Sequence, residues 1–457
     1  MPAPGALATD ERAALRAELL RLAWPVVLQN LLYTAMFYVD TWMIARVGEP
    51  AVAAMGMVGP IAHTVGSVLL AIGVGTVATT ARAWGERDPL KQRGEAATAL
   101  AAAALVGVPL SAAGAFLLPA MADLFALPGA PEVTEMARGF LAFEGASLAF
   151  LCISVAAGGI LRATGRTGVP MAAAFAANGA NVFLNWVFIY GNLGAPAMGV
   201  RGAGLATAAA TAVQACLTAG YLFTPGSPIR LGAGSFRAVT REAAARFLRV
   251  SLPAAAEPLL MQSGFLIYAK AITLLGQGAV AAHRAAITVE SMTFMPGTGF
   301  AVAGAAIVGQ CLGAGRPDKA DFGFRVGARW ATYLMSAIGV TFLLFPKTWV
   351  DLFLGPGMET VAYSAALCLA IAAVEQPFMA LGMTYAGALR GAGDTRSPVL
   401  VGVVGIWLIR VPLGWALAFP AGLGIYGIWI TMIADWAARA AIFAALWRRG
   451  RWKSIKL

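Results

Sequence analysis

The chain has 457 residues, of which 59% are hydrophobic and only 12% are charged, with a formal net charge of +11 and a mean hydropathy of +0.75. Soluble domains carry about 25% charged residues, so this composition excludes a water-soluble fold and predicts a polytopic helical membrane protein. The basic residues form no stripe interleaved with aromatic residues, so we expect no nucleic-acid partner.

The chain begins with a short amphipathic segment, residues 1–22. It carries Asp10, Glu11 and Glu18 beside its arginines, and no small-residue cleavage site precedes the first apolar run. This pattern predicts a cytoplasmic lead-in to the first helix and not a signal peptide.

Apolar runs long enough to cross a bilayer, which takes about 20 residues each, recur along the rest of the chain. The longest stretch without one is 224–249, which is rich in proline and glycine and indicates a cytoplasmic linker at mid-chain. We therefore expect an amino-terminal lobe over 23–223, a carboxy-terminal lobe over 250–447 and a basic cytoplasmic tail over 448–457. The predicted spans are 23–46, 51–82, 94–124, 134–161, 169–191, 200–223, 250–275, 279–312, 322–353, 360–389, 397–419 and 424–447.

Lysine and arginine concentrate in alternate connections between these spans. Under the positive-inside rule the basic connections are cytoplasmic, so both termini face the cytoplasm and the number of spans is even. The expected location is the inner, or plasma, membrane. The basic connections hold Arg82, Arg87, Lys91 and Arg93; Arg162 and Arg166; Arg230, Arg237, Arg241, Arg246 and Arg249; Arg316 and Lys319; and Arg390 and Arg396.

The two halves of the chain repeat each other without gaps. Pro25 matches Pro253, 228 residues later, and the same offset aligns the segments 48–54 with 276–282 and 161–167 with 389–395. Each half has six spans, so the two copies have the same orientation in the membrane. The predicted fold is an all-α polytopic membrane protein of twelve transmembrane helices, built as two six-helix lobes related by a parallel internal repeat. Such transporters bind substrate between the halves near mid-membrane.

Several motifs in this order resemble the multidrug and toxic-compound extrusion (MATE) family over essentially the whole chain. They are Trp24-Pro25 with Val39-Asp40-Thr41, the segment 308–315, the segment 387–395, and Arg410-Val411-Pro412-Leu413. The resemblance implies a V-shaped pair of six-helix lobes, alternating access to a central cavity, and antiport of cationic or amphiphilic drugs against protons or sodium ions.

Asp40 lies well inside the first span, where inserting a carboxylate costs at least about 2.5 kcal/mol. Its repeat partner is Tyr268, so the fold does not need an acid at this position. In the fifth span Asn178, Asn181 and Asn185 recur three and four residues apart, which places them on one helix face. Their repeat partners are Ile406, Ile409 and Leu413, so this polar stripe belongs to the first half alone.

We interpret Asp40, Asn181 and Asn185 as a cation or proton site, because carboxylate and amide oxygens suit hard cations and a desolvated carboxylate can hold a proton. Asn178 and Thr207 are further candidate members. The alternative is an interhelical hydrogen bond that only packs the lobe. The resemblance implies the same amino-lobe site. Some members of the family have a second acid where Asn185 stands, and the absence of that acid here weakens the case for sodium.

The second half carries its own acids in apolar sequence, Glu257, Glu290 and Glu375. We expect them, with Gln262 and Met261, to line the substrate cavity or to couple to protons. Glu257 could instead form a structural pair with Lys270 or have an interfacial role. Some drug-exporting relatives place their acid where Met261 stands here.

The predicted function is therefore a cation-coupled antiporter that exports small cationic or amphiphilic organic compounds, with no enzymatic activity. We expect a monomer in the lipid bilayer, with no cofactor beyond the coupling ion, H⁺ or Na⁺, and no metal beyond a sodium ion at Asp40. Two alternatives stay open. A lipid-linked precursor flippase would want a basic cavity, and a membrane-embedded enzyme would want paired acids or histidines near an interface.

Overall fold

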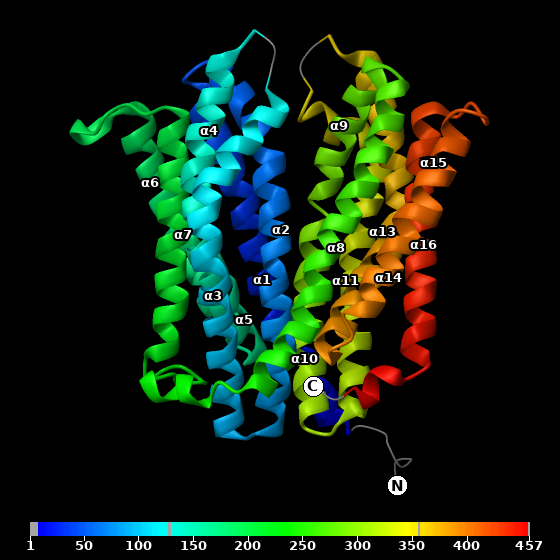
Figure 1. Cartoon of the computed structure of the whole chain (residues 1–457). Coiled ribbons are helices and arrows are strands. Elements are labelled where there is room, and N and C mark those ends of the chain that lie inside the picture. The colour runs from blue at the N-terminus through cyan, green and yellow to red at the C-terminus, as the bar shows by residue number, and fades with distance from the viewer. Residues whose placement is uncertain (1–7, 127–128, 355–356, 456–457) are drawn as a thin grey trace. The chain divides into compact units, whose positions relative to one another are not determined.

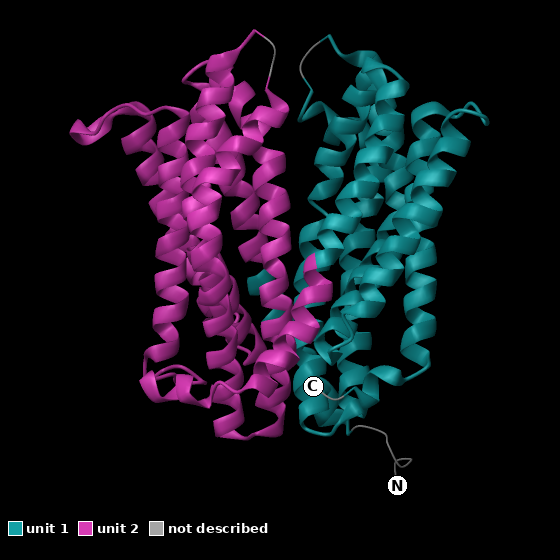
Figure 2. Ribbon diagram, viewed as in Figure 1, with its two compact units in different colours: residues 1–27, 256–457 teal, residues 28–255 magenta. Residues whose placement is uncertain are grey.

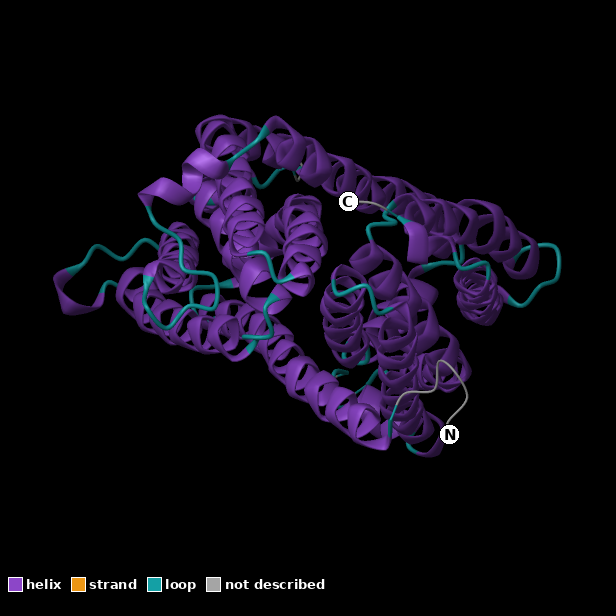
Figure 3. Cartoon of the chain, turned by 90° about the horizontal axis from the view of Figure 1, so that it is seen from below, coloured by secondary structure: helices purple, strands orange, loops and turns teal. Residues whose placement is uncertain are grey.

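The computed structural model describes residues 8–126, 129–354 and 357–455, and in this part of the chain every regular element is a helix, joined to the next by a short connection (Figures 1 and 3). The first half contains α1 (Thr9–Ala45), α2 (Glu49–Glu86), α3 (Pro89–Met121), η1 (Ala122–Phe125), α4 (Pro131–Ala146), α5 (Leu148–Ala163), α6 (Gly168–Tyr190), η2 (Asn192–Gly194), α7 (Val200–Phe223) and η3 (Ala233–Ala238). The second half contains α8 (Arg241–Leu274), α9 (Gln277–Ser291), α10 (Phe294–Gly313), α11 (Pro317–Leu344), α12 (Pro346–Asp351), α13 (Glu359–Ala392), α14 (Arg396–Val403), η4 (Val404–Arg410), α15 (Val411–Ala418), α16 (Gly424–Arg448) and η5 (Arg451–Ser454).

These helices account for the twelve predicted spans. Ten elements of the described chain are long and apolar enough to cross a membrane, and the pair α4 and α5, bent by 47°, makes an eleventh. The twelfth is α11, whose 28 residues extend about 42 Å. Its first turns carry Asp318, Lys319, Asp321 and Arg325, so the apolar part of α11 is shorter than the whole helix. The eighth span is broken, because α9 ends at Ser291 and α10 begins at Phe294.

The helices form two compact units (Figure 2). The amino unit is Leu28–Ala255, and the carboxy unit is Ala256–Leu457 together with the chain up to Val27. Helices α1 and α8 therefore each contribute to both units. The boundaries that we predicted for the lobes, linker and tail stay predictions, since the units divide within these two helices.

The predicted lead-in continues without a break into α1 and packs in the carboxy unit. Leu19 and Leu22 are fully buried there. The Glu11 carboxylate lies 2.8 Å from the Lys319 ammonium, at the start of α11.

The predicted linker packs in the amino unit, where η3 contacts α3 and the Arg246 guanidinium lies 2.6 Å from the buried carboxylate of Glu95. Small residues let the amino-unit helices approach closely. A Cβ on Gly145 of α4 would lie 2.2 Å from the Gly114 carbonyl oxygen of α3, so no larger residue fits this crossing.

In the carboxy unit α13 is the central helix and packs against α9, α10, α11 and α16. Its apolar core includes Trp429, Phe342 and Leu369, each with at most 1% of its surface exposed. The counterparts of Asn178 and Asn181, Ile406 and Ile409, fall in η4, a seven-residue π-helix over Val404–Arg410, and the counterpart of Asn185, Leu413, follows in α15. π-Helical turns inside α-helices are rare and are frequent at functional sites.

Candidate functional site

Three helices of the amino unit bring the predicted ion-site residues together. Asp40 lies on α1, Asn181 and Asn185 lie one turn apart on α6, and Thr207 lies on α7. The Asn185 side-chain amide donates to Asp40 Oδ1 at 2.5 Å and to Asn181 Oδ1 at 3.0 Å. The Asn181 amide donates to Thr207 Oγ1 at 3.3 Å. The chain of hydrogen bonds therefore runs from α1 through α6 to α7.

The Asp40 carboxylate is enclosed by protein. Asp40 is 4% exposed, and Asn181 and Asn185 are fully buried. No lysine, arginine or histidine of the described residues has a side-chain nitrogen within 4.0 Å of it. The Asn185 Oδ1 atom also receives no hydrogen bond from the described part of the chain. Such a site has a buried acid without a cation to balance it, and a free acceptor oxygen beside it.

Asn178 has a different partner. Its amide donates to the backbone carbonyl of Leu32 at 2.7 Å, which ties α6 to α1 two turns before Asp40. The same region holds Tyr33, whose hydroxyl accepts from the Gln29 amide at 3.0 Å and also from the Gln214 amide of α7. This second polar layer of the amino unit was not identified from the sequence.

Glu144 on α4 is an acid that the sequence analysis missed. It is half-buried, and it lies near enough to Asp40 for the two carboxylates to interact electrostatically. The signal that could have found it was the presence of a charge inside the fourth apolar run, at the end of α4 where the chain bends into α5.

In the carboxy unit two of the predicted acids meet. Glu290 on α9 and Glu375 on α13 are both fully buried, and their carboxyl groups lie within interaction range of each other. No donor among the described residues hydrogen-bonds to any of their four oxygens. Two adjacent carboxylates without donors are strongly disfavoured when both are charged.

Two buried arginines share one carboxylate beside this pair. The Arg410 Nε atom, at the end of η4, lies 2.8 Å from Asp435 Oδ2 on α16. Arg439, one turn after Asp435, donates to both of its carboxylate oxygens. Asp435 and Arg439 form the pair that their spacing of four residues predicts. Gly405 makes room for it, because a Cβ there would lie 2.1 Å from Asp435 Oδ1.

The fixed charges of this cluster can be counted. Arg410 and Arg439 contribute two positive charges and Asp435 one negative charge. Arg410 also interacts with both Glu290 and Glu375. The cluster is electrically neutral when the two glutamates together carry one negative charge and one proton.

Glu257 pairs with an arginine of α13 and not with Lys270, the partner that the sequence suggested. Both Glu257 carboxylate oxygens accept from Nη2 of Arg390 on α13, at 2.6 and 2.7 Å. The suggested pair with Lys270 is therefore wrong, and Lys270 is exposed. The physical reason is that Lys270 lies more than three turns further along α8, whereas Arg390 approaches from a neighbouring helix.

Met261 and Gln262 follow Glu257 by about one turn of α8. The Met261 sulfur accepts a weak hydrogen bond from Arg439 Nη1 at 3.7 Å, which joins α8 to the buried charge cluster. Gln262 is half-buried. Of the predicted carboxy-half set, Glu290 and Glu375 therefore form one cluster, Met261 touches its edge, and Glu257 forms a separate ion pair.

Comparison with known proteins decides the family. The sequence profile of the MatE family matches twice, over residues 25–187 and 253–416, one match in each half. This chain belongs to the MatE family. It is 32% identical to a protein of Pseudomonas aeruginosa named "Probable multidrug resistance protein NorM", over 96% of this chain and 90% of that one. It is 29% identical to a Thermotoga maritima protein of the same name, over 98% of this chain and 95% of that one.

Solved MATE structures have the same fold. A "multidrug resistance MATE family transporter" in an outward-facing conformation matches with a TM-score of 0.88 at 23% identity, over 99% of this chain and 100% of that chain. A transporter of the same superfamily from Pyrococcus furiosus matches with a TM-score of 0.87 at 23% identity, over 98% and 99%. The predicted all-α fold with a two-lobe repeat is thus confirmed. The family also confirms the prediction that the protein is a multi-pass membrane transporter rather than an enzyme.

Proposed function

We propose that this MatE protein is a cation-coupled antiporter of the inner membrane, with both termini cytoplasmic, that exports small cationic or amphiphilic organic compounds by alternating access. The relatives named as multidrug resistance proteins support the substrate class. The observation that carries the coupling mechanism is the buried Asp40 carboxylate, held by Asn185 and without a cationic partner in the described chain.

A buried carboxylate with no balancing cation is unstable as a bare charge. It is stabilised either by taking up a proton or by binding a metal cation. Asn185 and Asn181 connect Asp40 of α1 to α6 and α7, so neutralising Asp40 weakens a charge-assisted hydrogen bond in this chain. Occupancy can drive export only if the two transport states bind the cation with different affinity.

The proton is the coupling ion that we favour at Asp40. One carboxyl group can take a proton without any other change of ligand. A sodium ion would need several oxygens, and the Asn181 oxygen already accepts from Asn185. Sodium would require the Asn185 amide to turn its unbonded Oδ1 toward Asp40, with Thr207 completing the site.

The glutamate pair of the carboxy unit is a second proton acceptor in this scheme. With one proton shared by Glu290 and Glu375, the buried charges of that unit balance. A second proton would leave one uncompensated positive charge, so its uptake must be linked to another change, such as binding or release of substrate.

The test is dye efflux from proteoliposomes under separate proton and sodium gradients, with the wild type and Asp40→Asn. We expect a proton gradient alone to drive efflux in the wild type and neither gradient to drive it in the variant. The matched control is Asp10→Asn, which removes an exposed acid of the same helix and should leave efflux unchanged. If efflux requires a sodium gradient, sodium and not the proton is the coupling ion in this scheme. Gradient-independent turnover of a lipid, or full efflux in Asp40→Asn, would contradict the proposed antiport.

A further inference from the structure

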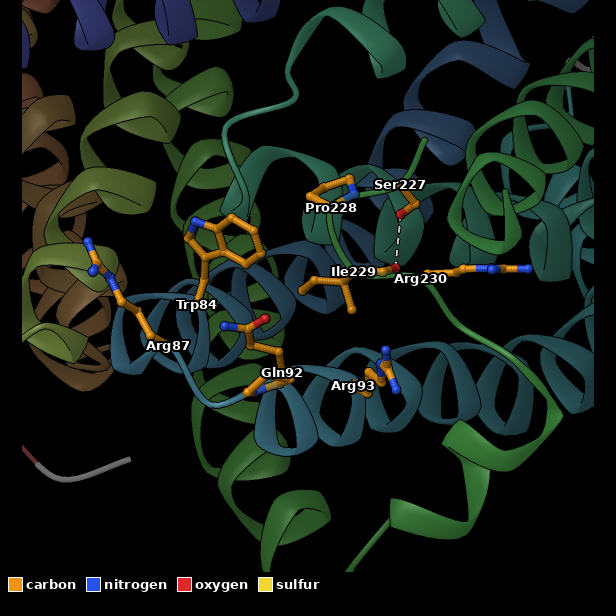
Figure 4. Close-up of a pocket in the computed structure, with 9 residues that line it drawn as sticks. Trp84, Arg87, Gln92, Arg93, Ser227, Pro228, Ile229 and Arg230 are labelled. Atoms are coloured by element: carbon orange, nitrogen blue, oxygen red, sulfur yellow. Dashed lines mark hydrogen bonds between the residues drawn. The ribbon is translucent and has the colours of Figure 1, made fainter. Parts of the chain in front are cut away.

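A cavity of about 600 Å³ lies at one end of the amino unit, where α2 ends, α3 begins and the segment 227–230 passes over them (Figure 4). This volume is within the range of about 300–1,000 Å³ that is typical of small-molecule sites. The connection between α2 and α3 is one of the basic connections, so this is the cytoplasmic end under the positive-inside rule. Its lining residues are Trp84, Arg87, Pro89, Gln92, Arg93, Ser227, Pro228, Ile229 and Arg230.

The lining carries three arginines, Arg87, Arg93 and Arg230, and no acid. All three are exposed, and none forms an ion pair within the described residues. Three positive charges therefore line the cavity, and no acid among its lining residues balances them.

The acids that are near these arginines in the sequence have other partners. Glu86 pairs with Lys91. The Asp88 carboxylate caps α3 and accepts from the backbone amides of Leu90 at 2.9 Å and Lys91 at 3.3 Å. Glu95 is buried against Arg246. Because these carboxylates are already bonded, none is available to neutralise the cavity.

The cavity is lined by both apolar and polar side chains. In Figure 4 the Trp84 ring, the Ile229 side chain and the Gln92 amide lie toward one another, and the side chains of Arg87 and Arg230 extend outward on opposite sides of them. Ser227 Oγ donates to the Ile229 carbonyl at 2.9 Å, and Leu231 is bonded to the end of α7 through the Leu222 carbonyl, also at 2.9 Å. These bonds fix the segment that closes the cavity.

Arg87 has an unusual backbone conformation. It caps the C-terminus of α2 in the left-handed region, with φ of 60°, where glycine is the favoured residue. An arginine there is strained, because its Cβ lies too close to the backbone in the left-handed conformation. The fold thus keeps an arginine at the rim of the cavity where a glycine would be more stable.

We propose that this cavity binds the phosphate of an anionic headgroup. Guanidinium groups bind phosphate by paired, charge-assisted hydrogen bonds. Arginines beside a tryptophan at the cytoplasmic end of a span are placed to meet anionic lipid, with the aromatic ring at headgroup level. The same chemistry would accept a soluble phosphate ester, and the experiment separates the two sources. The proposal does not depend on the transport function, since Asp40 takes no part in it.

The experiment measures binding of phosphatidylglycerol to the purified full-length protein by native mass spectrometry, with phosphatidylcholine as the neutral lipid. The test variant is Arg87→Gln, Arg93→Gln and Arg230→Gln together. The control variant is Arg237→Gln, Arg241→Gln and Arg249→Gln, which removes the same charge from exposed arginines outside the cavity. We expect the test variant to lose about a hundredfold in affinity, because each arginine near an anionic headgroup contributes about fivefold. The control should bind like the wild type.

Two further arms complete the test. Arg87→Gly suits the left-handed conformation, so it removes one charge without threatening the fold and should weaken binding about fivefold. Inorganic phosphate and glycerol phosphate are then added as competitors. Displacement of the lipid by either would assign the site to a soluble phosphate, within the same chemistry. Equal lipid binding by the test and control variants, or no preference of the wild type for phosphatidylglycerol, would overturn the proposal.

Discussion

The two units use the same repeat to hold different chemistry. Asp40 of α1 corresponds to Tyr268 of α8, and Thr207 of α7 corresponds to Asp435 of α16, in each case 228 residues later. The first and last helices of each copy therefore keep a polar contact region, but the acid has moved from one helix to the other. In the amino unit the acid has only neutral partners, and in the carboxy unit it lies between two arginines.

A second pair of equivalent positions shows the same difference. Glu257 and Arg390 form an ion pair in the carboxy unit, and their counterparts are Gln29 and Arg162. Gln29 donates to the Tyr33 hydroxyl. The amino unit therefore keeps the arginine of this pair but has a neutral amide in place of the acid. An acid that is already paired has little reason to bind a mobile cation, so the comparison points to Asp40 as the group that changes charge during transport.

The largest expected effect comes from replacing Asp40, the acid that distinguishes the amino unit from the carboxy unit. Asp40→Asn should reduce ion-driven efflux to the level of protein-free vesicles, because an amide cannot alternate between two charge states. Tyr268→Phe, at the equivalent position, should keep efflux and lose about 1 kcal/mol of stability, since it removes a hydrogen bond to the Ile428 carbonyl. Efflux and thermal unfolding in detergent measure the two effects. Loss of efflux in Tyr268→Phe alone would reverse the assignment of the units.

The second prediction concerns the paired acid. Asp435→Asn leaves Arg410 and Arg439 without their carboxylate inside the membrane, and should destabilise the protein by about 3–5 kcal/mol. At the equivalent position, Thr207→Val should cost about 1 kcal/mol. Chemical or thermal unfolding of both variants checks the contrast, and similar losses in the two would show that the arginines do not depend on Asp435.

The third prediction tests whether Glu290 and Glu375 together supply the charge that balances the buried arginines of the carboxy unit. A single Glu375→Gln keeps one carboxylate, to which the new amide can donate, so its stability should stay within about 1 kcal/mol of the wild type. Glu290→Gln with Glu375→Gln removes the last balancing charge and should cost about 3 kcal/mol or more. Additive effects of the two single changes would mean that the glutamates do not act as a pair.

The smallest expected effect separates Asn178 from the rest of its stripe. Asn178→Ala removes a hydrogen bond to the Leu32 carbonyl and should cost about 1 kcal/mol while leaving the ion dependence of efflux unchanged. Asn185→Ala removes the donor to Asp40 and should shift the proton or sodium concentration that gives half-maximal efflux. An equal shift in both variants would place Asn178 in the ion site.

Part of the site could be predicted because helical spacing and the repeat are properties of the sequence. Asn181 and Asn185 share a helix face by their spacing, and their apolar counterparts mark them as specific to the first half. The contact of Asp40 with Asn185 joins positions 145 residues apart, so no local pattern implies it. The charge of Glu144 inside an apolar run is a local signal, but its proximity to Asp40 is likewise set by the tertiary structure.

The sequence by itself determined the membrane class, the helices, the parallel repeat and the family, because each rests on composition, local periodicity or aligned motifs. Only the tertiary structure decided which charges have partners. It assigned Glu257 to Arg390, Asp435 to two arginines, and Glu290 to Glu375, and it gave Asp40 a neutral hydrogen-bond partner and no cation among the described residues. The physical reason is that the charge state of a buried group depends on atoms within a few ångströms of it, and in a helical bundle most of those atoms come from other helices.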